Sequence, residues 1–384
     1  MFHLPPMSTI EIPEIPRENR RGRAAATNAA GRFERHARVP VDDGWGGRGG
    51  WGRAADSDAA PSVLRTEVRE ERPRSVITRN TSPDLPFDRS LNPYRGCEHG
   101  CIYCFARPTH SWLGLSAGLD FETRLIARPR AAQQLAQELA RRSYVPKVLA
   151  IGTNTDPYQP VERDRGIMRS VLEVLRDHYH PVAVTTKGTL VERDIDLLAE
   201  MAGRGLAQVG ISVTTLDPGL ARAMEPRAPA PERRLAAIRA LSDAGVPVRV
   251  MIAPVVPALT DPELESILAA ASEAGARAAN WIMLRLPFEV AGLFRDWLAE
   301  HYPDRAERVM ARVREMHGGK DYSAEWGRRM RGEGHYARLV AARFDIAARR
   351  LGLATVLPAL RTDLFKVPPK PGDQLDLFDR DPHT

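Results

Sequence analysis

The chain has 384 residues, of which 43% are hydrophobic and 27% charged, an ordinary balance for a soluble globular protein. No apolar run approaches the roughly 20 residues of a membrane span, and residues 1–23 lack the apolar region of a secretory signal. We therefore expect a cytoplasmic protein without membrane contact. The net charge of +6 is compatible with a nucleic-acid partner. Arginine supplies nearly all of that positive charge, however, and an excess of arginine with abundant alanine can also reflect genomic base composition.

Residues 1–84 show no sustained helical or strand period and are rich in Gly, Pro, Ser, Asp and Arg, which predicts a mostly disordered extension. Within it, residues 44–53 interleave arginine with tryptophan on a glycine-rich backbone. Such a segment can attract phosphates and stack on unpaired bases. A solvated linker of biased composition is the more frequent meaning of this pattern.

All three cysteines of the chain lie in one segment with the spacing C-x₃-C-x₂-C, as Cys97, Cys101 and Cys104. Iron–sulfur clusters are normally held by four thiolates, so three would leave one iron open, as a catalytic metal site requires. A structural zinc site completed by His99 or His110 is the alternative. A disulfide framework is not expected, because it needs paired cysteines and an oxidising compartment.

From residue 85 the pattern changes to alternating strands and helices. A short strand is expected before the cysteines, within residues 89–96. The strands expected after it are residues 145–151, 181–186, 206–213, 246–252 and 278–284, and the helices between them are residues 129–142, 165–178, 192–201, 231–244 and 261–274. Units of about 25 to 40 residues are typical of parallel strands joined by helical crossovers.

This alternation predicts an α/β fold with about six parallel strands. A doubly wound sheet and a barrel both satisfy it. A metal loop after the first strand favours the barrel, because catalytic groups of such barrels lie at the carboxyl ends of the strands.

The cysteine loop, with Tyr103 before its last cysteine, resembles the signature of the radical S-adenosylmethionine (SAM) superfamily. Residues 92–97 (NPYRGC), 152–160 (GTNTDPYQP) and 225–229 (EPRAP) narrow the resemblance to the branch related to spore photoproduct lyase, often labelled photolyase-like DNA repair proteins. The resemblance covers roughly residues 85–360. It implies a partial (β/α)₆ TIM-like barrel that is open on one side to admit a large substrate.

This gives four expected regions along the chain. Residues 1–84 form the extension and residues 85–287 the barrel. Residues 288–362 form a helical region, with helices over 289–301, 304–316 and 334–351 that cover the open side. Residues 363–384 form a flexible, proline-rich tail.

The resemblance implies that Cys97, Cys101 and Cys104 hold a [4Fe–4S] cluster whose open iron is chelated by the amino and carboxylate groups of SAM. An electron from an external donor then cleaves SAM to a 5′-deoxyadenosyl radical that abstracts hydrogen from the substrate.

SAM should contact groups at the carboxyl ends of the strands. Gly152, Thr153 and Asn154 follow the second strand, where the family contacts the SAM amino group. Asp156 in the same loop could accept from an ammonium group or from substrate. Tyr103, beside the cysteines, is a further candidate contact.

Lys187 ends the third strand and Ser212 the fourth, and in this branch a Lys and a Ser at these places hold the SAM carboxylate. Glu225 and Arg234 are weaker candidates, for ribose or carboxylate contacts. Taken singly, a Lys after a strand is usually a surface charge, a Ser there a helix cap, and a Glu–Arg couple an exposed ion pair.

The chain departs from spore photoproduct lyases in one respect. Those enzymes are thought to use a further cysteine as hydrogen donor, and this chain has none beyond the cluster set. Either Tyr158 or Tyr103 donates the hydrogen, or the chain catalyses a different reaction.

Near the end of the chain, after the proline-rich residues 366–372, five residues resemble the pentapeptide that binds the bacterial sliding clamp. They are Gln374, Leu375, Asp376, Leu377 and Phe378. Three apolar side chains and a glutamine on a flexible tether suit a small pocket. The alternative is a tail that folds back onto the barrel.

The leading hypothesis is a radical SAM enzyme that acts on nucleic acid, with DNA repair as the expected role. The second is a radical SAM enzyme that modifies RNA, a protein or a metabolite. The third is a zinc-stabilised nucleic-acid-binding protein without catalysis.

Overall fold

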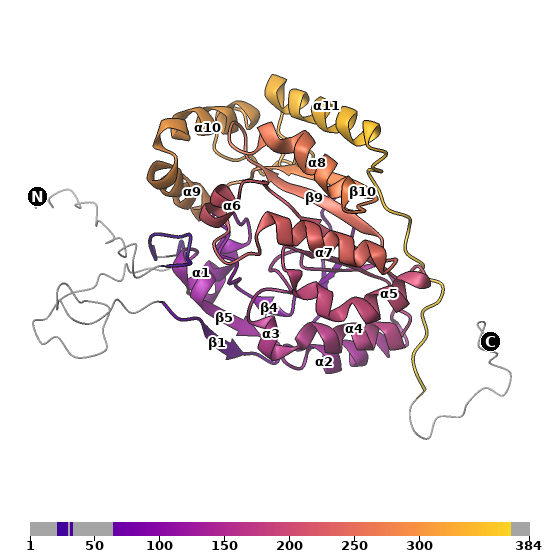
Figure 1. Cartoon of the computed structure of the whole chain (residues 1–384). Helices are drawn as coiled ribbons and strands as arrows, with labels where there is room; N and C mark the ends of the chain where they lie inside the picture. The colour runs from indigo at the N-terminus through magenta and orange to yellow at the C-terminus, as the bar shows by residue number, and fades with distance from the viewer. Residues whose placement is uncertain (1–20, 30, 34–63, 370–384) are drawn as a thin grey trace, which may run out of the picture.

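The computed structural model describes residues 21–29, 31–33 and 64–369, and Figure 1 shows its arrangement. Its centre is a seven-stranded sheet with the strand order β10-β9-β8-β7-β6-β3-β2. Six strands are parallel to their neighbours: β3 (Arg89–Leu91), β6 (Leu149–Ile151), β7 (Val182–Thr186), β8 (Ala207–Ser212), β9 (Val248–Val255) and β10 (Ala278–Met283). The short β2 (Thr78–Arg79) pairs antiparallel with β3 at one edge. Within the described ranges no ladder joins β10 to the other edge, so the sheet is an open barrel rather than a closed one.

Helices connect the parallel strands and cover one face of the sheet (Figure 1). The connecting helices are α2 (Ala131–Leu139), α3 (Glu162–Arg165), α4 (Ile167–Asp177), α5 (Ile195–Gly203), α6 (Pro218–Met224), α7 (Pro231–Asp243) and α8 (Leu264–Glu273), with the 3-10 turns η2 (Thr189–Asp194) and η3 (Asp261–Glu263). Helix α2 packs on α4, α4 on α5, and α7 on α8. Each crossover therefore supports the next one along the sheet.

Three further helices continue this layer beyond β10: α9 (Glu289–His301), α10 (Pro303–Met316) and α11 (Gly334–Arg350). Helix α11 lies on α8 and α10, and α10 lies on α9. Helix α9 contacts the 3-10 helix η1 (Arg107–Leu113), which follows the cysteine segment. The C-terminal helices thus lead back to the cysteines.

Alternation along the strands explains why one face of the sheet is apolar. In β7, Val182 and Val184 are buried against the helices, whereas Ala183 and Thr185 are partly exposed on the other face. Helix α4 buries Ile167, Met168, Val171, Leu172 and Leu175, at the spacing of one helical stripe. These two apolar surfaces form one continuous core.

The prediction of a parallel α/β fold with a partial, open barrel is confirmed. The expected strands and helices from residue 129 onwards are all present, with their ends shifted by a few residues. The largest shift is in the strand expected at 145–151, which begins only at Leu149.

The described part of residues 1–84, which were predicted to be mostly disordered, contains two short strands, β1 (Glu67–Glu70) and β2. Strand β1 pairs with β5 (Arg124–Ala127), which pairs with β4 (Tyr94–Arg95), in a small second sheet. Strands β1 and β5 were not predicted because each has only four residues, too few for a period to appear, whereas β4 lies within the segment 89–96 where a strand was expected. Strand β2 escaped notice for the same reason.

The tail expected at 363–384 also begins with packed residues. Phe365 lies against Tyr144, His178 and His180, and the backbone N–H of Lys366 donates to the carbonyl of His178 at 3.1 Å. Residues 44–53 and 374–378 lie outside the described residues. None of the helices in the described part is long and apolar enough to cross a membrane.

Candidate active site

The parallel strands bring five segments that are distant in sequence to one edge of the sheet. Because all six strands run the same way, their carboxyl ends meet there. Residues 97–104 follow β3 and β4, residues 152–156 follow β6, Lys187 follows β7, Ser212 ends β8 and Arg285 follows β10. This edge is the candidate active site.

The cysteine segment is held from behind by a buried ion pair between Arg107 and Glu122. Both side chains are fully buried, and the guanidinium donates to the Glu122 carboxylate at 2.5 Å. Arg107 also donates to the carbonyl oxygens of Gly100 and Cys101, each at 2.9 Å. The shape of the loop between the first two cysteines is therefore fixed by one guanidinium.

Residues 23–25, from the N-terminal part of the chain, complete this support. The backbone N–H groups of Ala24 and Ala25 donate to the Glu122 carboxylate at 3.1 and 3.0 Å. The Arg23 guanidinium donates to the Glu122 carbonyl at 2.7 Å. This segment is thus part of the scaffold of the site.

The three cysteines are free thiols; Cys97 and Cys101 are buried and Cys104 is partly exposed. Burial raises the pKa of Cys101 to about 12, against the opposing effect of the nearby Lys187. Burial likewise raises the pKa of Cys97, and a hydrogen bond from the backbone of Asp156 opposes it. These thiols would become thiolates only on binding a metal, since burial alone keeps them protonated.

The histidines of the zinc alternative are engaged elsewhere. His99 lies with Nδ1 3.3 Å from an Asp156 carboxylate oxygen, and His110 Nε2 is 3.0 Å from the carbonyl of Arg124. In the part of the chain that the structure describes, no three His, Cys, Asp or Glu side chains converge on one ion. Three free thiols on one loop fit an iron–sulfur cluster, in which each thiolate binds a different iron.

Asp156, in the loop after β6, stabilises the site by accepting several hydrogen bonds. Its carboxylate accepts from Thr186 Oγ1 at 2.5 Å and from the backbone N–H groups of Lys187 and Tyr158 at 2.7 and 2.9 Å. Burial would raise the pKa of Asp156, but His99 and these hydrogen bonds lower it to about 2. These contacts give Asp156 a positioning role, and the expected contact with an ammonium group or substrate stays a prediction.

Glu225 and Arg234 form a buried ion pair, not the exposed pair that is common for these residues. Glu225 also accepts hydrogen bonds from the Tyr103 hydroxyl and from Thr214 Oγ1. Arg234 donates further to the carbonyl of Ser212 at 3.2 Å. Burial would raise the pKa of Glu225, but the charges of Arg234 and Lys187 lower it to about 2.

Lys187 is a cation of this site whose ammonium group has no direct partner among the described residues. Its ammonium group lies 5.7 Å from the centre of the Tyr103 ring. This ammonium group makes no hydrogen bond, and no ion pair within 4 Å, with any of the described residues. Burial would lower the pKa of Lys187, but Cys101, once ionised, and the carboxylate of Glu225 raise it, so the amine is charged. Lys187 therefore presents a positive charge beside the cysteines.

The neighbouring strand ends are shaped by close packing. Gly152 has φ +85°, and a Cβ there would lie 2.0 Å from the carbonyl oxygen of Thr185, so no larger residue fits. The backbone N–H of Asn154 donates to the side chain of Asn92 at 3.1 Å. Ser212 Oγ donates to the carbonyl of Ala253 at 3.2 Å and keeps its acceptor lone pairs.

A family model described as the radical SAM superfamily matches residues 91–271. An uncharacterised protein of Mycobacterium tuberculosis is 40% identical over 235 residues, which are 61% of this chain and 68% of the relative. The chain belongs to the radical SAM superfamily. A more distant uncharacterised protein, of Methanocaldococcus jannaschii, is 24% identical over 219 residues, 57% of this chain and 78% of that protein.

Solved structures of spore photoproduct lyase share this radical SAM fold. The complex with dinucleoside spore photoproduct has a TM-score of 0.50 at 15% identity, covering 74% of this chain and 78% of that one. A double mutant bound to AdoMet and the same dinucleoside has a TM-score of 0.51, also at 15% identity, covering 74% and 77%. As a member of the radical SAM superfamily, the chain is an enzyme of the radical SAM type.

The two tyrosines expected as hydrogen donors lie in different surroundings. Tyr103 lies in the radical SAM site, between Glu225 and Lys187. Tyr158 is buried in the main core, and its hydroxyl donates to Asp194 at 3.0 Å. The loop after β6 turns the Tyr158 ring inward, and its role as a hydrogen donor stays a prediction.

Three polar residues on the inner face of the sheet were not expected. Gln208, Arg249 and Asn280 lie on β8, β9 and β10, and each has a buried polar atom without a hydrogen-bond partner among the described residues. Burial lowers the pKa of Arg249, and no carboxylate within the described ranges pairs with it. In the sequence, these three residues can be recognised as single polar residues at alternating positions in otherwise apolar strands.

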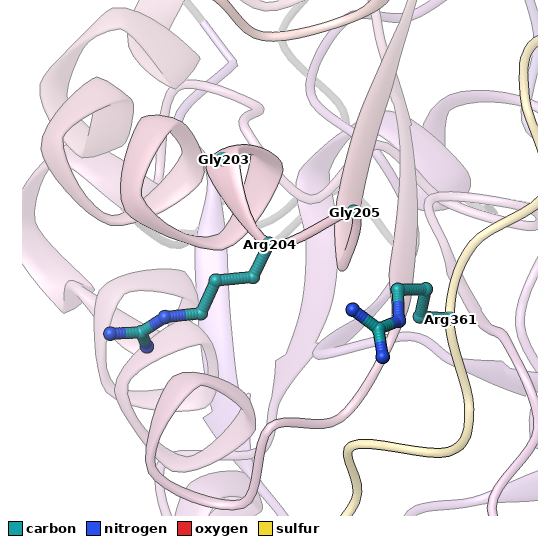
Figure 2. Close-up of a pocket in the computed structure, with 4 residues that line it drawn as sticks. All are labelled: Gly203, Arg204, Gly205 and Arg361. Atoms are coloured by element: carbon teal, nitrogen blue, oxygen red, sulfur yellow. The ribbon is translucent and has the colours of Figure 1, made fainter. Parts of the chain in front are cut away.

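A surface hollow lined by Gly203, Arg204, Gly205 and Arg361 lies at the opposite, amino-terminal end of β8 (Figure 2). Both arginines already have carboxylate partners: Arg204 pairs with Glu200 and Arg361 with Asp363. This hollow has no part in the radical SAM site.

Replacing Glu122 by Gln should loosen the cysteine loop, because it leaves the Arg107 charge buried without its partner. We expect a loss of about 3 to 5 kcal/mol in the free energy of unfolding and faster labelling of the cysteines by a thiol reagent. Urea unfolding and labelling rates of the metal-free chain would measure both. The control is Glu315→Gln in the exposed Arg312–Glu315 pair, which should change stability by less than about 1 kcal/mol. Equal effects of the two substitutions would contradict the role of Glu122.

Glu225→Gln should change the acid stability of the metal-free chain in a defined pH window. The folded pKa of Glu225 is about 2, below its ordinary value of 4.5, so the ionised carboxylate stabilises the fold above pH 4.5. That contribution, on the order of 3 kcal/mol, is lost as the pH falls towards 2. The stability difference between wild type and variant in urea should therefore shrink over this range. A difference that does not depend on pH would exclude this electrostatic role.

Proposed function

We propose that this enzyme holds a [4Fe–4S] cluster through Cys97, Cys101 and Cys104, binds SAM beside it and acts on nucleic acid. The observation that supports the cofactor assignment is the set of three free thiols on one braced loop, next to an unpaired ammonium group at the carboxyl edge of a parallel sheet. When bound and reduced by an external one-electron donor, the cluster supplies the electron for the cleavage of SAM.

The residues of this chain then bind and orient the cofactor. Lys187 has no direct partner and is suited to the SAM carboxylate, with Ser212 as a neutral second contact. Thr153 and Asn154 offer polar groups to the SAM amino end. Glu225 and Arg234 hold Tyr103 in place, and no SAM contact is needed to satisfy them.

Tyr103 is the hydrogen donor we propose, since the cluster would occupy every cysteine. Burial is the main cause that raises the pKa of its hydroxyl far above the ordinary value, and the carboxylate of Glu225 adds to it. The phenol therefore keeps its hydrogen at neutral pH.

A nucleic-acid substrate, with DNA repair as the role, is supported by two observations. The lyase that shares this fold has been solved with a dinucleoside photoproduct bound, and the chain carries a net charge of +6. The unpaired guanidinium of Arg249 and the amides of Gln208 and Asn280 offer a polar inner face suited to a nucleotide. RNA, a protein or a metabolite is the alternative substrate if nucleic acid has no effect on SAM cleavage.

Anaerobic reconstitution with iron and sulfide should give about four irons per chain and, with dithionite and SAM, release 5′-deoxyadenosine. Single-stranded or ultraviolet-irradiated DNA should increase that release. Cys104→Ala should lose the cluster and the product, because two thiolates do not hold it. Bound zinc without 5′-deoxyadenosine would overturn the assignment, and release that no nucleic acid changes would favour the other substrates.

We further propose that residues 374–378 bind the bacterial sliding clamp, as their similarity to the clamp-binding pentapeptide suggests. Replacing Leu377 and Phe378 together by Ala should abolish retention on immobilised clamp, because two of the three apolar contacts are lost. Val356→Ala, an exposed residue outside the peptide, serves as control. Unchanged retention of the double variant would exclude this partner.

A further inference from the structure

Exposed aromatic side chains gather around the carboxyl edge of the sheet. Five Phe and Trp side chains of the described residues are exposed, by 43 to 72%: Phe33, Phe105, Trp112, Phe288 and Trp326. We call these five residues the aromatic rim. Leaving so much apolar surface in water opposes folding, and clustered exposed apolar surface commonly marks a binding site.

The rim begins beside the loop that carries the three cysteines. Phe105 directly follows Cys104, and the guanidinium of Arg285 lies 4.3 Å from the centre of its ring. Phe288 follows three residues after Arg285, at the start of α9, with an unusual positive φ of 51°. A non-glycine residue held in this conformation costs energy and is enriched at functional sites.

Trp112 and Phe33 extend the rim on one side. Trp112 lies on η1, and Phe33 packs against it with ring centres 4.3 Å apart. The guanidinium of Arg32 lies between two rim residues, 5.1 Å from the Phe33 ring and 3.8 Å from the Phe288 ring. A hydrogen bond of 3.2 Å from Ser111 to Glu289 holds η1 against α9.

Trp326 extends the rim on the other side. Arg329 lies 4.3 Å from the centre of its ring. The backbone N–H of Met283 donates to the carbonyl of Met330 at 2.8 Å, which fixes this loop beside the end of β10. Four of the five aromatic rings thus have an arginine over them, and the fifth, that of Trp112, packs on Phe33.

The arginines give the rim a charge that suits phosphate. Arg32 and Arg329 are near carboxylates, at 3.8 Å from Glu289 and 2.6 Å from Asp84. Arg285, in the centre, forms no ion pair with any described residue and is free to take an anion. Rings for stacking interleaved with arginine are what single-stranded nucleic acid requires, because only unpaired bases expose their faces.

We propose that the aromatic rim binds single-stranded nucleic acid, with unpaired bases stacked on Phe105, Trp112 and Phe288 and a backbone phosphate at Arg285. This inference rests on the proposed nucleic-acid substrate and specifies its form: a strand, or a locally opened duplex, in place of an intact duplex. The rim delivers the strand to the edge where the three cysteines lie.

The test uses the full-length, reconstituted enzyme and fluorescence anisotropy with a dye-labelled single strand of mixed sequence, and with its fully paired duplex. Trp112→Ala and Phe288→Ala should each weaken single-strand binding roughly 5- to 100-fold and change duplex binding little. Arg285→Met should weaken binding and reduce the slope of log Kd against log salt by about one unit. Ile346→Ala on α11, equally exposed but distant in the fold, is the control.

The release of 5′-deoxyadenosine, measured with the same strand, separates this inference from the proposed function. If the strand stimulates release but the rim variants bind it as tightly as Ile346→Ala does, the rim is not the binding surface and the nucleic-acid substrate stands. If the rim variants lose affinity while no oligonucleotide stimulates release, the rim stands and the substrate assignment falls. Tighter binding of the intact duplex than of the strand would overturn the rim proposal.

Discussion

The candidate site depends on the buried pair between Arg107 and Glu122. Burying two opposite charges costs solvation energy that their attraction alone rarely recovers, so such pairs are justified by the arrangement they impose. Here the guanidinium uses its fixed fork of donors to hold the carbonyls of Gly100 and Cys101. A lysine, with one charged atom, could not bind these groups in one plane. The position of the thiols therefore follows from a side chain that touches no cofactor.

The charged groups around the cysteines are of two kinds. Some pair within the protein and hold the site in shape, and others have no protein partner in the described part of the chain and can bind a ligand. Asp156 lies against His99 of the cysteine loop. Glu225 and Arg234 neutralise each other, and Arg234 also holds the end of β8 through the carbonyl of Ser212. Lys187 keeps its charge without a direct partner because Cys101, once ionised, and Glu225 raise its pKa. A site of this kind is already organised before a ligand arrives, so little of the binding energy is spent on reorganisation.

Much of the fold was predictable because it is local in sequence. The helices and strands from residue 129 onwards follow from periodicity, and the cysteine spacing with Lys187 and Ser212 at strand ends located the site. The sequence did not indicate features that are set by distant contacts. The bonds of Asp156 and Glu225, the inward turn of Tyr158 and the short strand β1 depend on partners 30 to 122 residues away or on a strand of four residues. Neither the amino-acid composition nor the hydrophobic periodicity of the sequence indicates these partners.

The attachment of residues 23–25 behind the cysteine loop has a consequence for the order in which the enzyme assembles. Ala24 is separated from Glu122 by 98 residues, and closing so long a loop is entropically costly until both ends are held by other structure. During synthesis the early segment leaves the ribosome long before its docking surface exists. We therefore expect the barrel strands and η1 to form first and the N-terminal segment to dock onto a loop that is already folded. Until that last step, the back of the cysteine loop, where Arg107 and Glu122 lie, is uncovered.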